Sequence, residues 1–186
     1  MSLEVVIGPM FSGKSSYIYS IVKRYGCLEI PTLVVKPSID DRYSVLPEVV
    51  THDGIKFSCV SAKSLMDIAE TVSDKEVIIV EEAQFFSDLL DFVVDAVDSK
   101  NKKVIVVGLD GDSNRKKFGQ ILDCIPLADK ITKLNALCVD CRDGTIGLFS
   151  YRVCNDKSQV HVGGAEDYKP LCRACYINAV KYSASC

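Results

Sequence analysis

The chain has 186 residues, of which 48% are hydrophobic and 25% charged, and its formal net charge is −3. This length and apolar content predict one folded domain, or one domain with a small appendage, and exclude a disordered chain. The slightly negative charge argues against a protein that binds nucleic acid mainly through phosphates, and no apolar run approaches the ~18 residues of a membrane span.

The N-terminal sequence and the cysteines favour the cytoplasm. The first residues, MSLEVVIG, lack the basic start and long apolar stretch of a secretory signal. The nine cysteines are an odd number. Without a secretory signal, reduced thiols and a metal site are favoured over a disulfide framework. We therefore expect a cytoplasmic protein that does not bind membranes.

Strand-like apolar runs alternate with helical patterns over the first 134 residues. The predicted strands are 3–7, 32–35, 56–60, 76–80, 104–109 and 130–134, and the predicted helices are 15–25, 61–72 and 87–99. Ser61 is expected to cap the second helix, and the polar segment 37–55 to form a loop. Strands separated by helices predict an α/β fold with a mostly parallel sheet.

The composition changes after residue 135. Cysteine becomes dense, glycine recurs, and short alternating segments predict hairpins. A tail of this size is too small to be stabilised by its own core, so we expect a covalent or metal staple.

The first predicted strand runs directly into a glycine-rich motif, GPMFSGKS, which matches G-x-x-x-x-G-K-[ST]. The motif consists of Gly8, Pro9, Met10, Phe11, Ser12, Gly13, Lys14 and Ser15. Its backbone N–H groups and the following helix N-terminus can hold phosphates. Lys14 is expected to reach the β- and γ-phosphates of ATP, and Ser15 to offer a hydroxyl to Mg²⁺. An accidental glycine turn is disfavoured by the strand before the motif and the helix after it.

The buried-strand pattern Val77–Val80 stops at two adjacent carboxylates, Glu81 and Glu82. In phosphate-loop proteins a carboxylate at the end of a nearby strand helps to hold Mg²⁺. One acid would suffice for that role, and the second can accept the proton of an attacking hydroxyl. Alternatively, both lie in the first turn of the next helix, where the helix dipole favours negative charge.

Four cysteines occur as two C-x-x-C pairs, and this spacing predicts a tetrahedral zinc site. The predicted ligands are Cys138, Cys141, Cys172 and Cys175. Since protein would fill all four positions, the predicted role is structural; the alternative is four unrelated thiols. The other cysteines, expected to be packing or surface thiols, are Cys27, Cys59, Cys124, Cys154 and Cys186.

In this order, the motifs resemble those of the cytosolic, zinc-containing type of thymidine kinase, and the resemblance covers nearly the whole chain. GPMFSGKS is similar to that family's phosphate loop, and EEAQFF to its Asp-Glu-Gly/Ala-Gln-Phe-Phe box. The other similar segments are DDRYS at 40–44, THD at 51–53, GLDGDSNRKKFG at 108–119 and VGGAEDYKPLCRAC at 162–175. Two departures stand out: Glu81 replaces an aspartate, and residues 112–114 are Asp-Ser-Asn where several relatives have Thr-Phe-Gln.

The resemblance implies a role for each matching position. Glu82 corresponds to the catalytic base, and Glu81 to the Mg²⁺-linked acid. Asp40, Arg42 and Gln84 correspond to residues at the ATP and phosphate site. The implied nucleoside-binding residues are Met10, Phe85, Leu109, Ser113, Phe118, Ser150, Gln159, Val160, His161, Val162, Gly163 and Tyr168. Residues 159–163 correspond to a lasso loop whose backbone grips the thymine edge. The resemblance also implies a homotetramer and feedback inhibition by dTTP.

Taken singly, these patterns also have ordinary interpretations. Residues 40–42 fit a solvated turn, and residues 163–164 a hairpin turn. The phenylalanines at 85, 86 and 118 fit a plain core, and the histidines fit structural roles. The joint occurrence of the motifs favours the functional interpretation.

We therefore predict a RecA-like phosphate-loop domain, residues 1–134, and a small C-terminal zinc-binding lobe, residues 135–186, that closes over a nucleoside. The implied reaction transfers the γ-phosphoryl group of ATP to the 5′-hydroxyl of thymidine, and secondarily of deoxyuridine, giving dTMP or dUMP. One alternative is an ATPase whose zinc lobe grips nucleic acid, which the near-neutral balance of charge in residues 135–186 disfavours. The other is a non-catalytic nucleotide sensor, which the presence of Glu82 disfavours.

Overall fold

The computed structural model describes residues 1–38, 48–50, 56–154, 158–161 and 163–183. Three of the predicted site residues, Asp40, Arg42 and Val162, lie outside these ranges.

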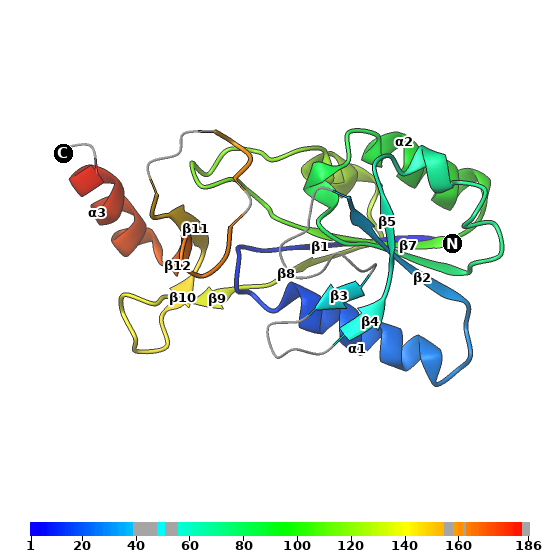
Figure 1. The fold of residues 1–186 in the computed structure, drawn as a ribbon, viewed down its shortest axis with the longest axis horizontal. Helices are drawn as coiled ribbons and strands as arrows, with labels where there is room; N and C mark the ends of the chain where they lie inside the picture. Colours follow the sequence, from blue (N-terminus) through cyan, green and yellow to red (C-terminus); the bar gives the residue numbers. More distant parts are fainter. Residues whose placement is uncertain (39–47, 51–55, 155–157, 162, 184–186) are drawn as a thin grey trace.

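A six-stranded sheet forms the centre of the molecule, with strand order β5-β2-β6-β7-β1-β8 (Figure 1). Its strands are β1 (Ser2–Ile7), β2 (Thr32–Pro37), β5 (Val60–Ala62), β6 (Val77–Val80), β7 (Lys103–Gly108) and β8 (Lys130–Lys133). Every neighbouring pair in this sheet is parallel, which confirms the predicted α/β fold. Since parallel strands end at a common edge, the segments after β1, β6 and β7 meet there.

Helices cover both faces of this sheet, α1 (Lys14–Gly26) on one side and α2 (Leu89–Val94) on the other (Figure 1). The chain continues from α2 into a short π-helical turn, η3 (Asp95–Ser99). Ile18 of α1 and Phe92 of α2 belong to two separate apolar clusters. One cluster takes Val6, Val34, Ile79, Ile105 and Val107 from the strands, and the other takes Val5, Val35, Ile78, Val80, Val104 and Val106. Strands buried on both faces explain the continuous apolar runs of the sequence.

The predicted helix over residues 61–72 is wrong. Ser61 lies in β5, where it pairs with Lys36, and the only helical turn that follows is η1 (Met66–Ile68), a 3₁₀ turn. The Asp88 carboxylate accepts hydrogen bonds from the Ser64 hydroxyl (2.6 Å) and the Met66 backbone N–H (2.9 Å). These bonds come from a distant part of the chain and fix an irregular path in place of a helix.

The predicted loop over residues 37–55 contains a short strand, β3 (Glu48–Val50), which pairs antiparallel with β4 (Lys56–Ser58). The single strand predicted at 56–60 is therefore two strands, β4 and β5, in different sheets. Strands of three residues carry too little alternation to be recognised in a sequence.

The C-terminal part consists of two small antiparallel pairs and a helix. β9 (Ala136–Leu137) pairs with β10 (Ile146–Gly147), and β11 (Phe149–Arg152) pairs with β12 (Tyr168–Leu171). This confirms the predicted hairpin-like pairing. The helix α3 (Arg173–Ser183), which the sequence analysis did not predict, begins directly after the last strand and packs against β11 and β12. No helix within the described ranges is both long and apolar enough to cross a membrane.

Candidate active site and metal centre

The glycine-rich motif forms a tight loop between β1 and α1. Gly13 has φ +80° and precedes the first residue of the helix, Lys14. A Cβ on Gly8 would lie 2.5 Å from the Leu134 carbonyl oxygen, so only glycine fits there. The Lys14 ammonium donates hydrogen bonds to the Pro9 carbonyl (2.8 Å) and the Gly8 carbonyl (3.3 Å). The loop therefore holds a cation above the N-terminus of a helix, an arrangement suited to a phosphate group.

The two carboxylates after β6 occupy different environments. Glu81 is buried, 7% exposed, and its Oε1 accepts a hydrogen bond from the Ser15 hydroxyl at 3.0 Å. This contact joins the phosphate-loop helix to the end of β6, although β7 separates β1 from β6 in the sheet. Glu82 has φ +47° and precedes a short 3₁₀ turn, η2 (Ala83–Phe85). The next α-helix, α2, begins only at Leu89, so the interpretation of both acids as first-turn residues of a helix is wrong.

Gln84 fixes the position of Glu82. Its Nε2 donates to Glu82 Oε2 at 2.5 Å, and its Oε1 accepts from the Leu109 backbone N–H at 3.0 Å. The side chain is 4% exposed and tightly enclosed. A Cβ on Gly108 would approach Gln84 Oε1 to 2.3 Å, and one on Gly119 would approach the Gln84 carbonyl oxygen to 2.1 Å. Gln84 thus links the acid after β6 to the end of β7.

The predicted nucleoside residues of the first domain lie close to this edge. The rings of Phe85 and Phe118 meet edge to face with centroids 5.3 Å apart. The Met10 backbone N–H donates to the Ser150 hydroxyl at 2.9 Å, so the phosphate loop contacts β11 of the C-terminal part. The structure therefore brings together predicted residues that are far apart in the chain.

The described part of the lasso is organised by polar side chains. Arg152 Nη1 donates to the Ser158 carbonyl (2.6 Å) and Nη2 to the Gln159 carbonyl (3.2 Å). Arg152 Nε donates to the Tyr168 hydroxyl (3.1 Å), which itself donates to the His161 carbonyl (2.9 Å). Burial raises the pKa of Tyr168 although the Arg152 guanidinium acts in the opposite direction, so the hydroxyl stays protonated at neutral pH.

Three residues that hold this region together were given no role by the sequence analysis: Arg152, Asp112 and Tyr176. Asp112 Oδ2 accepts a hydrogen bond from Gln159 Nε2 (3.0 Å), and the Tyr176 hydroxyl donates to the Ser113 carbonyl (2.7 Å). Arg152 is buried in its strand, 8% exposed, but the sequence around it carries no signal that could have indicated this network. The predicted residue Ser113 contributes its carbonyl to this network.

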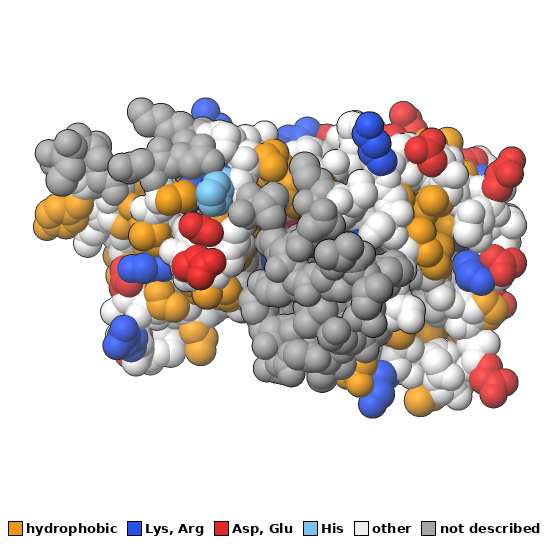
Figure 2. All heavy atoms as spheres, in the orientation of Figure 1, with side chains coloured by type: hydrophobic (Ala, Val, Ile, Leu, Met, Phe, Trp, Pro, Cys, Tyr) orange, Lys and Arg blue, Asp and Glu red, His pale blue; other side chains and the backbone are white. Residues whose placement is uncertain are grey.

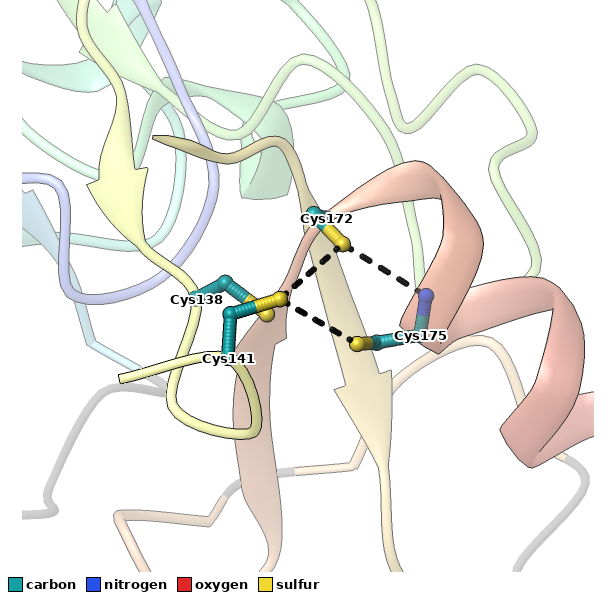
Figure 3. A group of neighbouring side chains, drawn as sticks. All are labelled: Cys138, Cys141, Cys172 and Cys175. Atoms are coloured by element: carbon teal, nitrogen blue, oxygen red, sulfur yellow. Dashed lines mark hydrogen bonds between the residues drawn. The ribbon is translucent and has the colours of Figure 1, made fainter. Parts of the chain in front are cut away.

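The four predicted metal-ligating cysteines converge on one point between β9, the end of β12 and the start of α3 (Figure 3). Cys141 Sγ lies 3.8 Å from Cys172 Sγ and 3.6 Å from Cys175 Sγ. Tetrahedral zinc with four thiolates separates its sulfurs by about 3.8 Å, so the donor set and spacing fit zinc. Burial raises the pKa of the Cys138 thiol, but backbone hydrogen bonds from Cys172, Cys141 and Asp140 lower it to about 6. A hydrogen bond with Cys175 lowers the pKa of Cys141, but its bonds with Cys138 and Cys172 raise that pKa overall, and bonds with Cys141 and Cys172 raise the pKa of Cys175. The thiolate is therefore favoured at Cys138, and a metal would displace the protons of Cys141 and Cys175.

The charged side chains of the described residues on the face drawn in Figure 2 do not form a basic surface that would bind the phosphates of nucleic acid. Lysine and arginine side chains are interspersed with acidic ones over the face drawn in Figure 2, among the residues that the structure describes. Grooves that bind nucleic acid carry continuous basic charge.

Comparison with known proteins agrees with this geometry. A family model described as "Thymidine kinase" matches residues 1–176. The chain is 39% identical to a thymidine kinase of Sheeppox virus (strain KS-1), over 94% of this chain and 96% of that protein. It is 41% identical to thymidine kinase from Oryza sativa subsp. japonica, over 95% of this chain and 66% of that protein. It is also 41% identical to thymidine kinase a of Arabidopsis thaliana, over 95% and 75%. The chain therefore belongs to the thymidine kinase family and is a kinase that phosphorylates thymidine.

Proposed function

We propose that the chain transfers the γ-phosphoryl group of ATP to the 5′-hydroxyl of thymidine, in the salvage of pyrimidine deoxynucleotides. The observation that carries this proposal is the hydrogen bond between Ser15 and Glu81, with Glu82 as the next residue. It places a phosphate loop, a buried acid and a second acid at one edge of the sheet, which are the parts that phosphoryl transfer to a hydroxyl needs.

The residues of the phosphate loop bind and orient ATP in this proposal. Backbone N–H groups of residues 8–15 hold the phosphates, and Lys14 neutralises charge on the group that moves. Ser15 and Glu81 would hold Mg²⁺, because a hydroxyl and a carboxylate are the hard oxygen donors that this ion prefers. When bound, Mg²⁺ neutralises charge on the phosphates. Asp40 and Arg42 complete the phosphate site by resemblance alone, since both lie outside the described residues.

Glu82 acts as the base that accepts the proton of the 5′-hydroxyl. Its left-handed backbone, φ +47°, directs it away from the course of a regular helix, and the Gln84 amide holds its Oε2. A carboxylate held in one orientation can meet the substrate hydroxyl without rearranging first. Gln84 is thus a positioning residue in this site.

The nucleoside is enclosed between the two parts of the chain. Phe85 and Phe118 offer an aromatic wall. The backbone of the lasso, residues 159–163, offers donors and acceptors to the pyrimidine edge, and Tyr168 and Arg152 hold that backbone. Further contacts are proposed for Met10, Leu109, Ser113, Ser150, Gln159, Val160, His161, Val162, Gly163 and Tyr168.

The remaining properties rest on the family. We propose a phosphate-loop domain at 1–134 and a zinc-stapled lobe at 135–186, with structural Zn²⁺ on the four clustered cysteines. A homotetramer, feedback inhibition by dTTP and a cytoplasmic location are proposed on the same basis, as is the absence of nucleic-acid and membrane partners.

The proposal is tested by measuring ADP release with ATP and a panel of free nucleosides. A site that reads hydrogen bonds rejects a wrong base strongly, but rejects a missing methyl group by only ~10–200-fold. We expect thymidine to be the best substrate, deoxyuridine to be weaker within that range, and deoxycytidine and purine deoxynucleosides to be nearly inactive. Equal kcat/KM for deoxycytidine and thymidine would contradict the proposed pocket, and ATP hydrolysis that responds to DNA instead would contradict the proposed reaction.

A further inference from the structure

A second group of metal-ligating side chains lies in the C-terminal part, separate from the four clustered cysteines. Cys154, His161 and Asp167 place a sulfur, an imidazole nitrogen and a carboxylate oxygen within 4.8 Å of one another. Cys154 follows β11, Asp167 directly precedes β12, and His161 lies between them on the lasso. The sequence alone predicted only a packing or surface thiol at Cys154.

The distances within this group are close to those of a coordination sphere, and the contact between Cys154 Sγ and His161 Nε2 also has the length of a hydrogen bond to sulfur. His161 Nε2 lies 3.7 Å from Cys154 Sγ and 3.7 Å from Asp167 Oδ1. Zinc-bound ligands in tetrahedral geometry stand about 3.6 Å apart for sulfur and nitrogen, and about 3.4 Å apart for nitrogen and oxygen. The distance from His161 Nε2 to Asp167 Oδ1 is longer than the about 2.7–3.2 Å of an N–H···O hydrogen bond. One nitrogen thus faces a sulfur and a carboxylate oxygen, each within about 0.3 Å of the separation expected around a shared zinc ion.

The four clustered cysteines provide an internal reference for this comparison. Their sulfur–sulfur distances of 3.6 and 3.8 Å are close to the value of about 3.8 Å that tetrahedral zinc requires. The same fold therefore brings two sets of side chains to metal-ligand spacing. The second set offers one sulfur, one nitrogen and one oxygen, a mixture that suits zinc-type ions and not Mg²⁺.

Hydrogen bonds and close packing hold the backbone at His161 and Asp167. The Tyr168 hydroxyl donates to the His161 carbonyl at 2.9 Å, and the Val153 backbone N–H donates to the Asp167 carbonyl at 2.8 Å. A Cβ on Gly163 would lie 2.3 Å from Asp167 Oδ2, so the carboxylate packs closely against a residue that must be glycine. The ligands are therefore largely preorganised before an ion binds.

Solvent can reach the cluster. The side chains of His161 and Asp167 are 26% and 28% exposed. In Figure 2 the one histidine within the described residues is visible at the surface, beside acidic side chains. A metal ion has a path to this cluster without opening the core.

We propose that Cys154, His161 and Asp167 form a second site for a zinc-type transition-metal ion, with a fourth coordination position left to solvent or to a bound group. The ion ties Cys154, two residues after β11, to Asp167, the residue before β12, with His161 between them. Occupancy of this site sets how rigidly residues 158–161 and 163–168 are held. Metal binding here needs no nucleoside, so the proposal stands or falls separately from the kinase roles above.

The test counts metal ions per chain in the full-length protein. Wild type is dialysed so that only tightly bound zinc remains, and is then titrated with Co²⁺, whose absorption reports thiolate ligation. Cys154→Ser removes the sulfur ligand, and Asp167→Asn keeps the size of the side chain against Gly163 while weakening the oxygen ligand. Cys27→Ser is the matched control, because Cys27 is exposed and follows α1 in the other domain.

We expect wild type and Cys27→Ser to bind one more metal ion than Cys154→Ser, with a cobalt–thiolate band that Cys154→Ser lacks. Loss of a residue that merely orients a ligand costs about 10–100-fold in affinity, so loss of a ligand should weaken binding by more than that. Metal should also slow hydrogen exchange over residues 158–168 in wild type and in Cys27→Ser, but not in Cys154→Ser. Equal stoichiometry and equal cobalt spectra in wild type and Cys154→Ser would overturn the proposal. Cys154→Ser could misfold and so also lose the metal on the four clustered cysteines. In that case the proposal is overturned if wild type and Asp167→Asn bind the additional Co²⁺ ion with equal affinity.

Discussion

The two parts of the chain are stabilised in different ways. The sheet domain buries two large apolar clusters, one on each face of the sheet, whereas the buried apolar cluster of the C-terminal part consists of Cys138, Leu171, Cys172 and Tyr176. Among the residues that the structure describes, Leu171 is the only one of the largest fully buried side chains that comes from this C-terminal part. A core of that size cannot offset the conformational entropy of ordering the chain, so metal and polar contacts must supply the rest.

The same difference separates the two sides of the proposed active site. The phosphate loop and the two acids follow strands that are buried on both faces, and therefore keep their positions without a ligand. The lasso is held by the hydrogen bonds of Arg152 and Tyr168 to backbone carbonyls. The residues proposed to bind phosphate are therefore held by the sheet. The residues proposed to bind the nucleoside are held by a few polar contacts.

The largest expected effect comes from removing the metal ion proposed for the four clustered cysteines. Structural zinc contributes on the order of 10 kcal/mol to the folding of small lobes, more than the apolar cluster here can supply. Chelation, or Cys141→Ser, should abolish hydrogen-exchange protection in residues 136–183 and leave β1, β6 and β7 protected. Cys27→Ser, which removes an exposed thiol, should change neither part. Equal loss of protection in both parts would contradict the difference in stabilisation.

Replacing the proposed base tests the side that is held by the sheet. Glu82→Gln keeps the size of the side chain but removes its ability to accept a proton. The rate of phosphoryl transfer should fall by ~10²–10⁴-fold while ATP still binds. ATP binding by calorimetry and single-turnover transfer are measured together. Glu70→Gln, at an exposed position, is the control and should behave like wild type. Near-normal turnover in Glu82→Gln would remove that residue from the mechanism.

Substituting alanine for a glycine in each part compares how much stability is lost when a Cβ is added at a glycine with a positive φ. Gly119 has φ +59°, and an added Cβ would lie 2.1 Å from the Gln84 carbonyl, a backbone atom that cannot move aside. Gly119→Ala should therefore lower the free energy of unfolding by about 2–4 kcal/mol, from overpacking and left-handed strain together. Gly144 has φ +88° with nothing within 4 Å, so Gly144→Ala should cost only the backbone term, about 1–2 kcal/mol. Thermal unfolding measures both, and equal losses would show that the contact with Gln84 is not tight.

The sequence predicted those features whose cause is local. The buried runs become parallel strands because residues such as Ile78 and Ile79 face two different cores. The phosphate loop and the paired cysteines are recognisable because their chemistry depends on fixed spacing along the chain. The helix at 61–72 was wrongly predicted because the competing partner, Asp88, lies more than twenty residues away.

Long-range polar contacts were out of reach for the same reason. Gln159 meets Asp112 across 47 residues of sequence, and Met10 meets Ser150 across 140. Nothing in the composition around Arg152 distinguishes it from a surface arginine until the fold buries it. The helix α3 was missed because its apolar residues do not form a clear stripe: Ile177 and Val180 are 39% and 43% exposed.

The smallest expected effect concerns the seam between the two parts. The Tyr176 hydroxyl, on α3, donates to the Ser113 carbonyl at 2.7 Å, while its ring packs under Arg115 at 4.6 Å and against Phe149. Tyr176→Phe keeps the ring contacts and removes the hydroxyl that donates to the Ser113 carbonyl and that also interacts with Arg115.

Because a single neutral hydrogen bond contributes about 0.5–1.5 kcal/mol, we expect a stability loss of that size. The loss should appear in hydrogen exchange as faster opening of residues 109–118 together with α3, and not of β1 or β6. Tyr182→Phe is the matched control, since Tyr182 lies on the same helix and is 77% exposed. If Tyr176→Phe and Tyr182→Phe have the same stability and the same hydrogen exchange, the seam is held by the aromatic and cationic contacts alone. The hydrogen bond to Ser113 then does not couple the C-terminal part to the sheet.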